Sequence, residues 1–127
     1  MNPNTVSLEN LRRKVLEVFV RKLEAKEGEN LLRVILYGSV ARRTDLPDSD
    51  IDVFVMLRKS DFGKRGEIVD IAVDVNYDYG EYKTHLAPLT MAEDNYRESI
   101  ALGLPLLKNI QRDGVVLFDR TQRGSIL

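Results

Sequence analysis

The sequence has no cysteine, no tryptophan and a single histidine, His85. The absence of cysteine excludes a disulfide scaffold, a thiolate zinc site and a cysteine nucleophile. One histidine cannot build a histidine-rich metal site by itself, so a metal ion here would be held by oxygen atoms. The carboxylates are therefore the side chains to examine.

The chain also lacks a surplus of either charge and any long apolar run. Its 19 basic and 20 acidic residues give a net charge of −1. This balance argues against direct binding of duplex nucleic acid, which needs an excess of positive charge. Without long apolar runs we expect neither a membrane span nor a signal peptide, and therefore a cytoplasmic location. With 127 residues, 43% of them hydrophobic, we expect one domain over 1–127.

Hydrophobic periodicity and turn residues predict alternating helices and strands. The expected elements are a helix capped by Ser7 and ending near Lys26, strands over 31–37 and 51–57, a helix capped by Asp61, a strand over 81–90, helices over 94–102 and 104–111, and a strand over 115–118. The loop between the first two strands is too short for a full crossover helix. We therefore expect an α/β or α+β domain with a small mixed β-sheet flanked by helices.

Three finer expectations accompany this pattern. Pro88 places the third strand at a sheet edge or a strand end, because proline cannot donate to a ladder. The inward stripe of the helix after Asp61 should comprise Ile68, Val69, Ala72, Val73 and Val75. The tyrosines of the second half are expected in the core or at its rim, although an exposed subset would suit a protein interface; they are Tyr77, Tyr79, Tyr82 and Tyr96.

The segment that carries chemistry is Tyr-Gly-Ser-Val-Ala-Arg-Arg-Thr-Asp-Leu-Pro-Asp-Ser-Asp-Ile-Asp over 37–52. Gly38 ends a buried strand and permits a tight turn whose N–H groups are open to a ligand. Ser39 adds a hydroxyl at the start of what can be a short helix, whose N-terminus favours an anion.

Asp50 and Asp52 follow on the next strand, two residues apart. Their side chains should therefore point to the same face, roughly 6.5–7 Å apart along the strand. This spacing suits two carboxylates that bracket one divalent cation, or a pair of cations about 3.5–4 Å apart. A phosphate-binding turn beside such a pair is the minimum equipment for phosphoryl or nucleotidyl transfer.

Each part of this motif alone is common in turns and at solvated strand starts, so neither is specific. Asp52 favours the functional interpretation of the motif, because Ile51, Val53 and Phe54 around it have the apolar character of a buried strand. A carboxylate at the mouth of such a strand is costly unless a partner or a metal compensates it. The combination is much more specific than its parts.

Gly38-Ser39, ten residues and then Asp50-Ile51-Asp52 resemble the Gly-Ser-x10-Asp-x-Asp signature of the polymerase-beta-like nucleotidyltransferase superfamily. The short chain is similar to the minimal nucleotidyltransferases, which lack the usual second domain. The resemblance extends to Ala41-Arg42, Ser49-Asp50 and the ending at 113–118, over about 8–119, with its specific part at 37–57.

The resemblance implies a role for each residue of the motif. Gly38 and Ser39 would bind the phosphates of ATP, and Asp50 and Asp52 would hold one or two Mg²⁺ ions. AMP would pass to a hydroxyl acceptor with release of pyrophosphate. Arg42 would steady the triphosphate, with a solvated loop arginine as the alternative. Arg43 stands at a position where the family often has glycine.

One departure from the family concerns a third carboxylate, which many members carry on the following strand. The segment 82–90 offers none. Asp70, Asp74 and Asp78 are near in sequence, although the first two are four residues apart on a helix, where a solvated outer face is the expected place. His85 is either a polar contact or a half-buried residue, and we favour the second.

Two functions of different classes remain open. The resemblance implies an antitoxin that transfers AMP to a tyrosine of a HEPN-domain ribonuclease toxin. The alternative is a catalytically weak or inactive nucleotide-binding module that inhibits its partner by contact alone. Transfer to a small molecule such as an aminoglycoside is less favoured, because 127 residues leave no room for an acceptor domain. The acceptor, the nucleotide preference and a homo- or hetero-oligomeric state stay open.

Overall fold

Five α-helices and four strands lie along residues 7–120, the part of the chain that the computed structural model describes. In chain order they are α1 (Leu8–Glu27), β1 (Leu31–Tyr37), α2 (Gly38–Arg42), β2 (Ile51–Leu57), α3 (Phe62–Tyr79), β3 (Leu86–Ala92), α4 (Glu93–Ala101), α5 (Pro105–Asp113) and β4 (Val115–Asp119), with a 3-10 turn at Gly28–Asn30. The expected order of elements is confirmed. The short helix α2 occupies the first residues of the expected loop.

The strands form one mixed sheet in the order β3-β2-β1-β4. The central strand β1 is antiparallel to both β2 and β4, whereas β2 and β3 are parallel and are connected through α3. The mixed sheet is as predicted, and Pro88 lies on the edge strand β3 as its chemistry requires.

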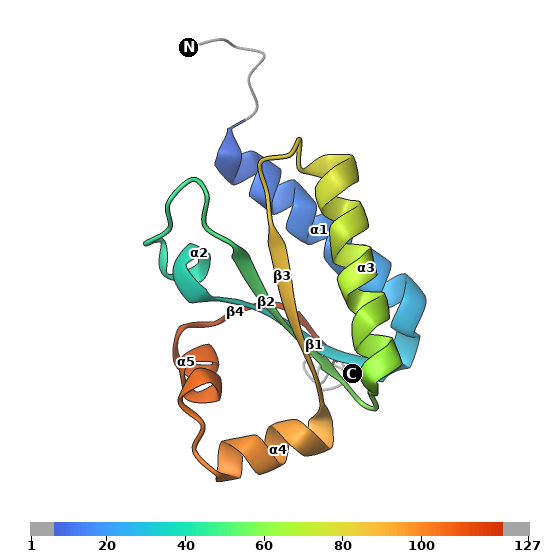
Figure 1. Cartoon of the computed structure of the whole chain (residues 1–127). Coiled ribbons are helices and arrows are strands. Elements are labelled where there is room, and N and C mark those ends of the chain that lie inside the picture. The colour runs from blue at the N-terminus through green and yellow to red at the C-terminus, as the bar shows by residue number, and fades with distance from the viewer. Residues whose placement is uncertain (1–6, 121–127) are drawn as a thin grey trace.

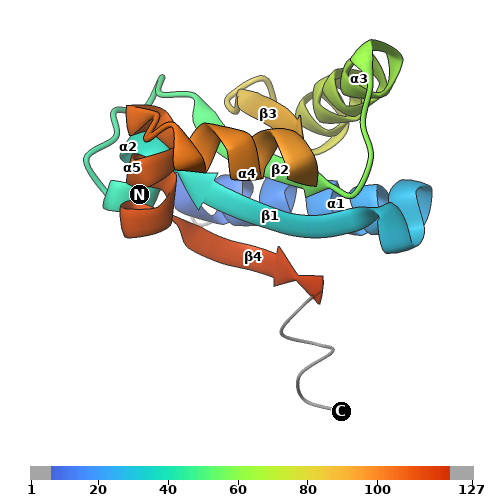
Figure 2. The ribbon, with the colours of Figure 1, turned by 90° about the horizontal axis from the view of Figure 1, so that it is seen from below.

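Helices cover both faces of this sheet (Figure 1). On one face α1 and α3 lie side by side and enclose the larger core, in which Phe19, Leu23 and Ile68 are fully buried. On the other face α4 and α5 cover a smaller core around Phe54 and Leu107. In the view of Figure 2, β4 lies at the margin of the sheet.

The two long helices begin where the sequence predicts. The Ser7 hydroxyl accepts a hydrogen bond from the backbone N–H of Asn10 at 3.1 Å, and the Asp61 carboxylate accepts one from Lys64 at 2.7 Å. These caps satisfy backbone donors that a helix N-terminus otherwise leaves unpaired.

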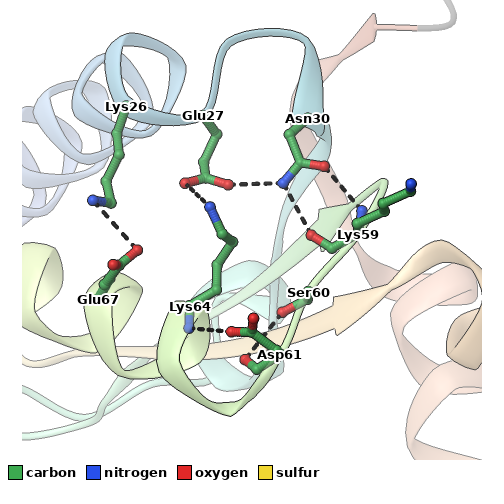
Figure 3. A network of polar contacts seen from close by, with 8 residues as sticks. All are labelled: Lys26, Glu27, Asn30, Lys59, Ser60, Asp61, Lys64 and Glu67. Carbon is green, nitrogen blue, oxygen red and sulfur yellow. Dashed lines mark hydrogen bonds and ion pairs between the residues drawn. The ribbon is translucent and has the colours of Figure 1, made fainter.

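A polar network fastens α1 to α3 at the end of the sheet where β1 begins and β2 ends (Figure 3). The Glu27 carboxylate accepts hydrogen bonds from Lys64 at 3.1 Å and from the Asn30 side chain at 2.8 Å. The Asn30 amide also accepts a hydrogen bond from the backbone N–H of Lys59 at 2.9 Å. These contacts tie the end of α1 to the start of α3.

The third strand was expected to begin at 81, but β3 begins at Leu86. Glu81 and Tyr82 both adopt positive φ values, 50° and 60°, within a turn in which the Lys83 N–H donates to the Gly80 carbonyl at 2.8 Å. Two left-handed residues in succession reverse the chain and cannot belong to a strand.

Three expectations about burial were wrong. Val69 and Val73 are exposed on α3, because the sheet contacts only the stripe of Ile68, Ala72 and Val75. His85 is exposed rather than half-buried, since it precedes β3. The prediction that Tyr77 and Tyr82 lie in the core or at its rim was also wrong, because they are 67% and 77% exposed. Within 7–120 no helix combines the length and the apolar character that a membrane crossing requires.

Candidate functional site

The motif residues meet at one end of the sheet because β1 and β2 are antiparallel. The last residue of β1, Tyr37, lies directly opposite Asp52, near the start of β2. Gly38 and Ser39 follow Tyr37 at once as the first turn of α2. The structure therefore brings the Gly-Ser turn and the Asp-x-Asp pair together, although ten residues separate them in sequence.

Gly38 and Asp52 are in direct contact. The backbone of Gly38 has φ = +76°, and a Cβ atom added there would lie 3.1 Å from Cγ and 3.3 Å from Cβ of Asp52. Such contacts are closer than nine in ten real Cβ contacts, and the conformation itself disfavours any other residue. Glycine is therefore required at this position by both the turn and the neighbouring carboxylate.

Asp52 is half-buried on the face that α4 and α5 cover, because opposite residues of an antiparallel pair share a face and Tyr37 packs there. Burial raises the pKa of the Asp52 carboxyl above its usual value, Asp50 raises it further, and Arg42 opposes the rise. Burial and Asp52 together also raise the pKa of the Tyr37 hydroxyl. The described residues thus compensate the ionised form of Asp52 only in part.

Such a pair of carboxylates fits a divalent cation. Asp50 is exposed and Asp52 is half-buried, two residues apart at the mouth of β2. Hard oxygen donors are the ligands that Mg²⁺ prefers, and a cation would relieve the unfavourable charge on Asp52. The chemistry of the donor set therefore agrees with a metal held by these two residues.

Arg42, at the end of α2, affects two carboxylates through its charge. Its charge lowers the pKa of Asp113 as well as that of Asp52, although the chief cause at Asp113 is its hydrogen bonds from Arg112 at 2.9 and 3.1 Å. Arg42 is thus placed within electrostatic reach of the Asp52 site, which is consistent with a role in binding an anionic substrate.

A buried arginine in α1 fixes the loop that connects α2 to β2. Arg12 is only 8% exposed, pairs with the Asp45 carboxylate and donates a hydrogen bond to the Leu46 carbonyl at 3.0 Å. The hydrogen bond from Arg12 is the main cause of a lowered Asp45 pKa. Ser49 then accepts a hydrogen bond from the Leu46 N–H at 2.8 Å, one residue before Asp50.

The role of Arg12 in holding this loop was not predicted from the sequence. Arg12 stands one helical turn after Leu8 and one before Leu16, so it lies on the apolar side of α1. A charged residue on that side was the available signal, because burial of an arginine requires a partner. The partner itself was not readable, since Asp45 is 33 residues away.

Asp70, Asp74 and Asp78 are exposed on α3, as the spacing of the first two predicts, and none of them reaches the Asp50–Asp52 pair. Among the described residues, no group of three or more His, Cys, Asp or Glu side chains is placed to hold a metal ion. The site as described therefore rests on two carboxylates.

Arg43 adopts a backbone conformation that ordinarily favours glycine. Its φ of 59° and ψ of 33° lie in the left-handed region, and its N–H closes α2 with a hydrogen bond to the Val40 carbonyl at 3.2 Å. The turn after α2 is thus made with an arginine, at the cost of local backbone strain.

The chain is similar in sequence to one protein family and to a named relative. The family model described as "Polymerase beta, Nucleotidyltransferase" matches residues 21–123 of the chain. A protein of Methanocaldococcus jannaschii named as a candidate protein adenylyltransferase is 29% identical over 116 residues, which span 88% of this chain and 75% of that protein.

Solved structures share the fold at lower sequence identity. A toxin-antitoxin structure with AMP-PNP has a TM-score of 0.55 at 18% identity, covering 85% of this chain and 77% of that one. A mutant of the toxin-antitoxin MntA-HpeT has a TM-score of 0.54 at 17% identity, covering 84% and 76%. A candidate nucleotidyltransferase from Sulfolobus solfataricus has a TM-score of 0.51 at 17% identity, covering 95% and 96%.

Proposed function

Because the chain belongs to the polymerase-beta nucleotidyltransferase family, whose model matches residues 21–123, we propose that it transfers AMP from ATP to a tyrosine hydroxyl of a partner HEPN ribonuclease toxin. In this role it is an antitoxin that silences the toxin by modification. The observation that carries the proposal is the contact of Gly38 with Asp52, which sets a phosphate-binding turn against a carboxylate pair.

The residues divide the work according to their chemistry. The backbone of Gly38 and the hydroxyl of Ser39 bind the triphosphate, and Arg42 balances part of its negative charge. Asp50 and Asp52 would hold one or two Mg²⁺ ions, which would supply positive charge against the phosphates and activate an attacking hydroxyl. The acceptor oxygen forms a bond to the α-phosphorus as the bond from that phosphorus to the bridging oxygen of pyrophosphate breaks. Pyrophosphate leaves and the hydroxyl proton passes to solvent. Positioning in line supplies much of the rate.

Two similarities support the acceptor. The relative from Methanocaldococcus jannaschii is named for protein adenylylation, and two structures of the same fold are of toxin-antitoxin proteins. The described residues form one sheet with its helices, so the partner supplies the acceptor side chain and most of its binding surface.

The test mixes the purified chain with MgCl₂, ATP labelled at the α-phosphate and the purified HEPN partner. We expect label on the partner, lost in Asp50→Asn and Asp52→Asn and retained in Asp48→Asn, an exposed acid of the same loop. Mass spectrometry identifies the modified side chain, and a partner tyrosine changed to phenylalanine should not be labelled. Wild-type chain that never labels its partner contradicts the proposal.

A second function is a nucleotide-binding module that inhibits its partner by contact alone. It is favoured by the two-carboxylate site, since no third acid joins Asp50 and Asp52 among the described residues. Under this alternative, Asp52→Asn still inhibits the toxin and no label is transferred. A thermal shift by ATP and Mg²⁺ that Ser39→Ala removes is expected under both functions and tests the nucleotide site itself.

A further inference from the structure

The helix α3 carries a second apolar row, outside the core. Val69, Val73 and Tyr77 follow each other at intervals of four residues and are 46%, 58% and 67% exposed. Residues four apart on a helix are neighbours, so the three side chains form one row about 12 Å long. Contiguous exposed apolar side chains of this kind are typical of a surface that contacts another molecule.

Tyr82 extends this row beyond the end of α3. Its ring lies edge-on to that of Tyr77, with the centroids 5.7 Å apart and the planes at 85°, and it is 77% exposed. Glu81 and Tyr82 both adopt left-handed backbone conformations, which residues with a side chain rarely do. Strained residues of this kind cluster where function requires them. The turn thus keeps an aromatic ring exposed beside Tyr77 despite local backbone strain.

The Tyr82 end of the row borders the Asp50–Asp52 site. The turn after α3 leads into β3, whose first residue, Leu86, lies opposite Ile51 in β2. The Ile51 N–H also donates a hydrogen bond to the His85 carbonyl at 2.8 Å. The turn is therefore at the same end of the sheet as the proposed site (Figure 1). A protein bound along α3 and this turn has its adjoining surface next to the two carboxylates.

Three aspartates run beside the apolar row and define the charge of a matching partner. Asp70, Asp74 and Asp78 are exposed and also follow each other at intervals of four residues. The ion pairs of α3 within residues 7–120 involve Lys64 and Glu67 instead. Like charges at this spacing repel each other, and acids near a helix C-terminus oppose the helix dipole. These aspartates therefore do not stabilise α3 itself.

The sign of this charge selects among the possible occupants. A nucleic acid and an anionic membrane are both negative, and a second copy of α3 would bring aspartates against aspartates. All three are repelled by the row of acids. A protein surface that combines exposed apolar side chains with lysine or arginine matches both the apolar row and the aspartates.

We propose that α3 and the turn after it form the docking surface for the protein acceptor, and that the occupant is a basic, partly apolar surface of the HEPN toxin. The inference rests on the nucleotidyl transfer proposed above and names the surface that brings the acceptor to that site. A ribonuclease needs positive charge to hold the phosphates of RNA, so a toxin of this class has the basic surface that the aspartates match.

The test measures the dissociation constant of the full chain and the purified HEPN partner by isothermal titration calorimetry, without nucleotide. We expect Tyr82→Ala and Val73→Gln each to weaken binding about 10-fold, because few central side chains carry most of the affinity of an interface. Leu102→Gln is the matched control, since it alters an apolar residue that is 79% exposed after α4. It should leave the dissociation constant unchanged.

The contribution of charge is tested separately. Asp74→Lys should weaken binding about 10–100-fold, because it places a cation against a basic surface. Glu17→Lys is an equal charge reversal at an exposed acid of α1 and should change the dissociation constant less than about twofold. Raising the ionic strength should weaken binding of the wild type more than binding of Asp74→Lys.

Labelling kinetics distinguish docking from the transfer itself. The α3 variants should raise the KM for the partner and leave kcat and the KM for ATP unchanged, with melting temperatures close to that of the wild type. Wild-type chain that labels the partner while the α3 variants bind like the wild type overturns the docking surface alone. Wild-type chain that binds through α3 and never labels the partner overturns the transfer alone. A self-associated chain that Val73→Gln dissociates also overturns the proposal, because a second copy then covers α3.

Discussion

Among the described residues, the face of the sheet under α1 and α3 buries a larger core than the face under α4 and α5, which also carries Asp52. The difference follows from what each face has to do. Two close-packed helices exclude water, which stabilises apolar side chains but would make a carboxylate pair very costly. The thinner layer leaves Asp50 exposed and Asp52 half-buried, as the proposed binding of a cation and a triphosphate requires. The larger core thus lies on one face of the sheet, and the proposed Asp50–Asp52 site lies on the other.

The largest expected effect is on the thicker face. Leu23 and Leu107 are both fully buried, the first in the core under α1 and α3 and the second under α5. We expect Leu23→Ala to reduce the free energy of unfolding by about 3–5 kcal/mol and Leu107→Ala by about 2–3 kcal/mol, because the smaller layer relaxes more easily around a cavity. Urea denaturation of both variants measures the difference. Equal losses would show that the two faces are equally rigid.

The next prediction concerns the contact between Gly38 and Asp52, with Gly28 as the matched control. Both have positive φ, but an added Cβ meets Asp52 only at Gly38 and nothing within 4 Å at Gly28. We expect Gly38→Ala to cost about 2–4 kcal/mol and to reduce label transfer, and Gly28→Ala to cost about 1–2 kcal/mol without changing transfer. Denaturation and single-turnover labelling separate the two effects. A fully active Gly38→Ala would remove the contact from the mechanism.

Asp52 tests whether the thinner face gives up stability for its chemistry. Because folding raises the pKa of Asp52, its favourable contribution is complete below the unfolded pKa of about 3.9 and is lost as the pH rises through the folded value. Without Mg²⁺ at pH 7, Asp52→Asn should therefore melt at a higher temperature than the wild type, and the gain should shrink towards pH 4.

The comparison for this variant is Asp70→Asn, which neutralises an exposed carboxylate of α3. It supplies the baseline for loss of one surface charge. A lower melting temperature for Asp52→Asn than for Asp70→Asn at pH 7 would contradict the trade of stability for function.

The smallest expected effect is at Arg43, where a left-handed conformation is held by a residue with a side chain. Arg43→Gly should stabilise the chain by less than about 1 kcal/mol, because relief of the strain exceeds the added entropy of the unfolded glycine. Arg43→Ala removes the same side chain but keeps the strained conformation, so it should give no gain. Differential scanning calorimetry of the two variants distinguishes backbone strain from side-chain effects.

Local patterns were sufficient for much of the fold. The cap residues Ser7 and Asp61 were predicted, as was the edge position of Pro88, because each follows from the hydrogen-bonding capacity of a single side chain or backbone group. Val69 and Val73 were placed wrongly, because α3 has apolar residues on two sides and periodicity cannot say which side meets the sheet. The late start of β3 was missed because left-handed Glu81 and Tyr82 have no signal in propensity.

The sequence by itself predicted that a Gly-Ser turn precedes Asp50 and Asp52, two carboxylates two residues apart where a strand begins, and hence the class of chemistry. This was possible because turn geometry and strand period are local properties. Only the tertiary structure decided that Gly38 touches Asp52 and that Arg12 holds the loop before Asp50. These are contacts between residues far apart in the chain, and they depend on strand order and on the side from which each helix packs.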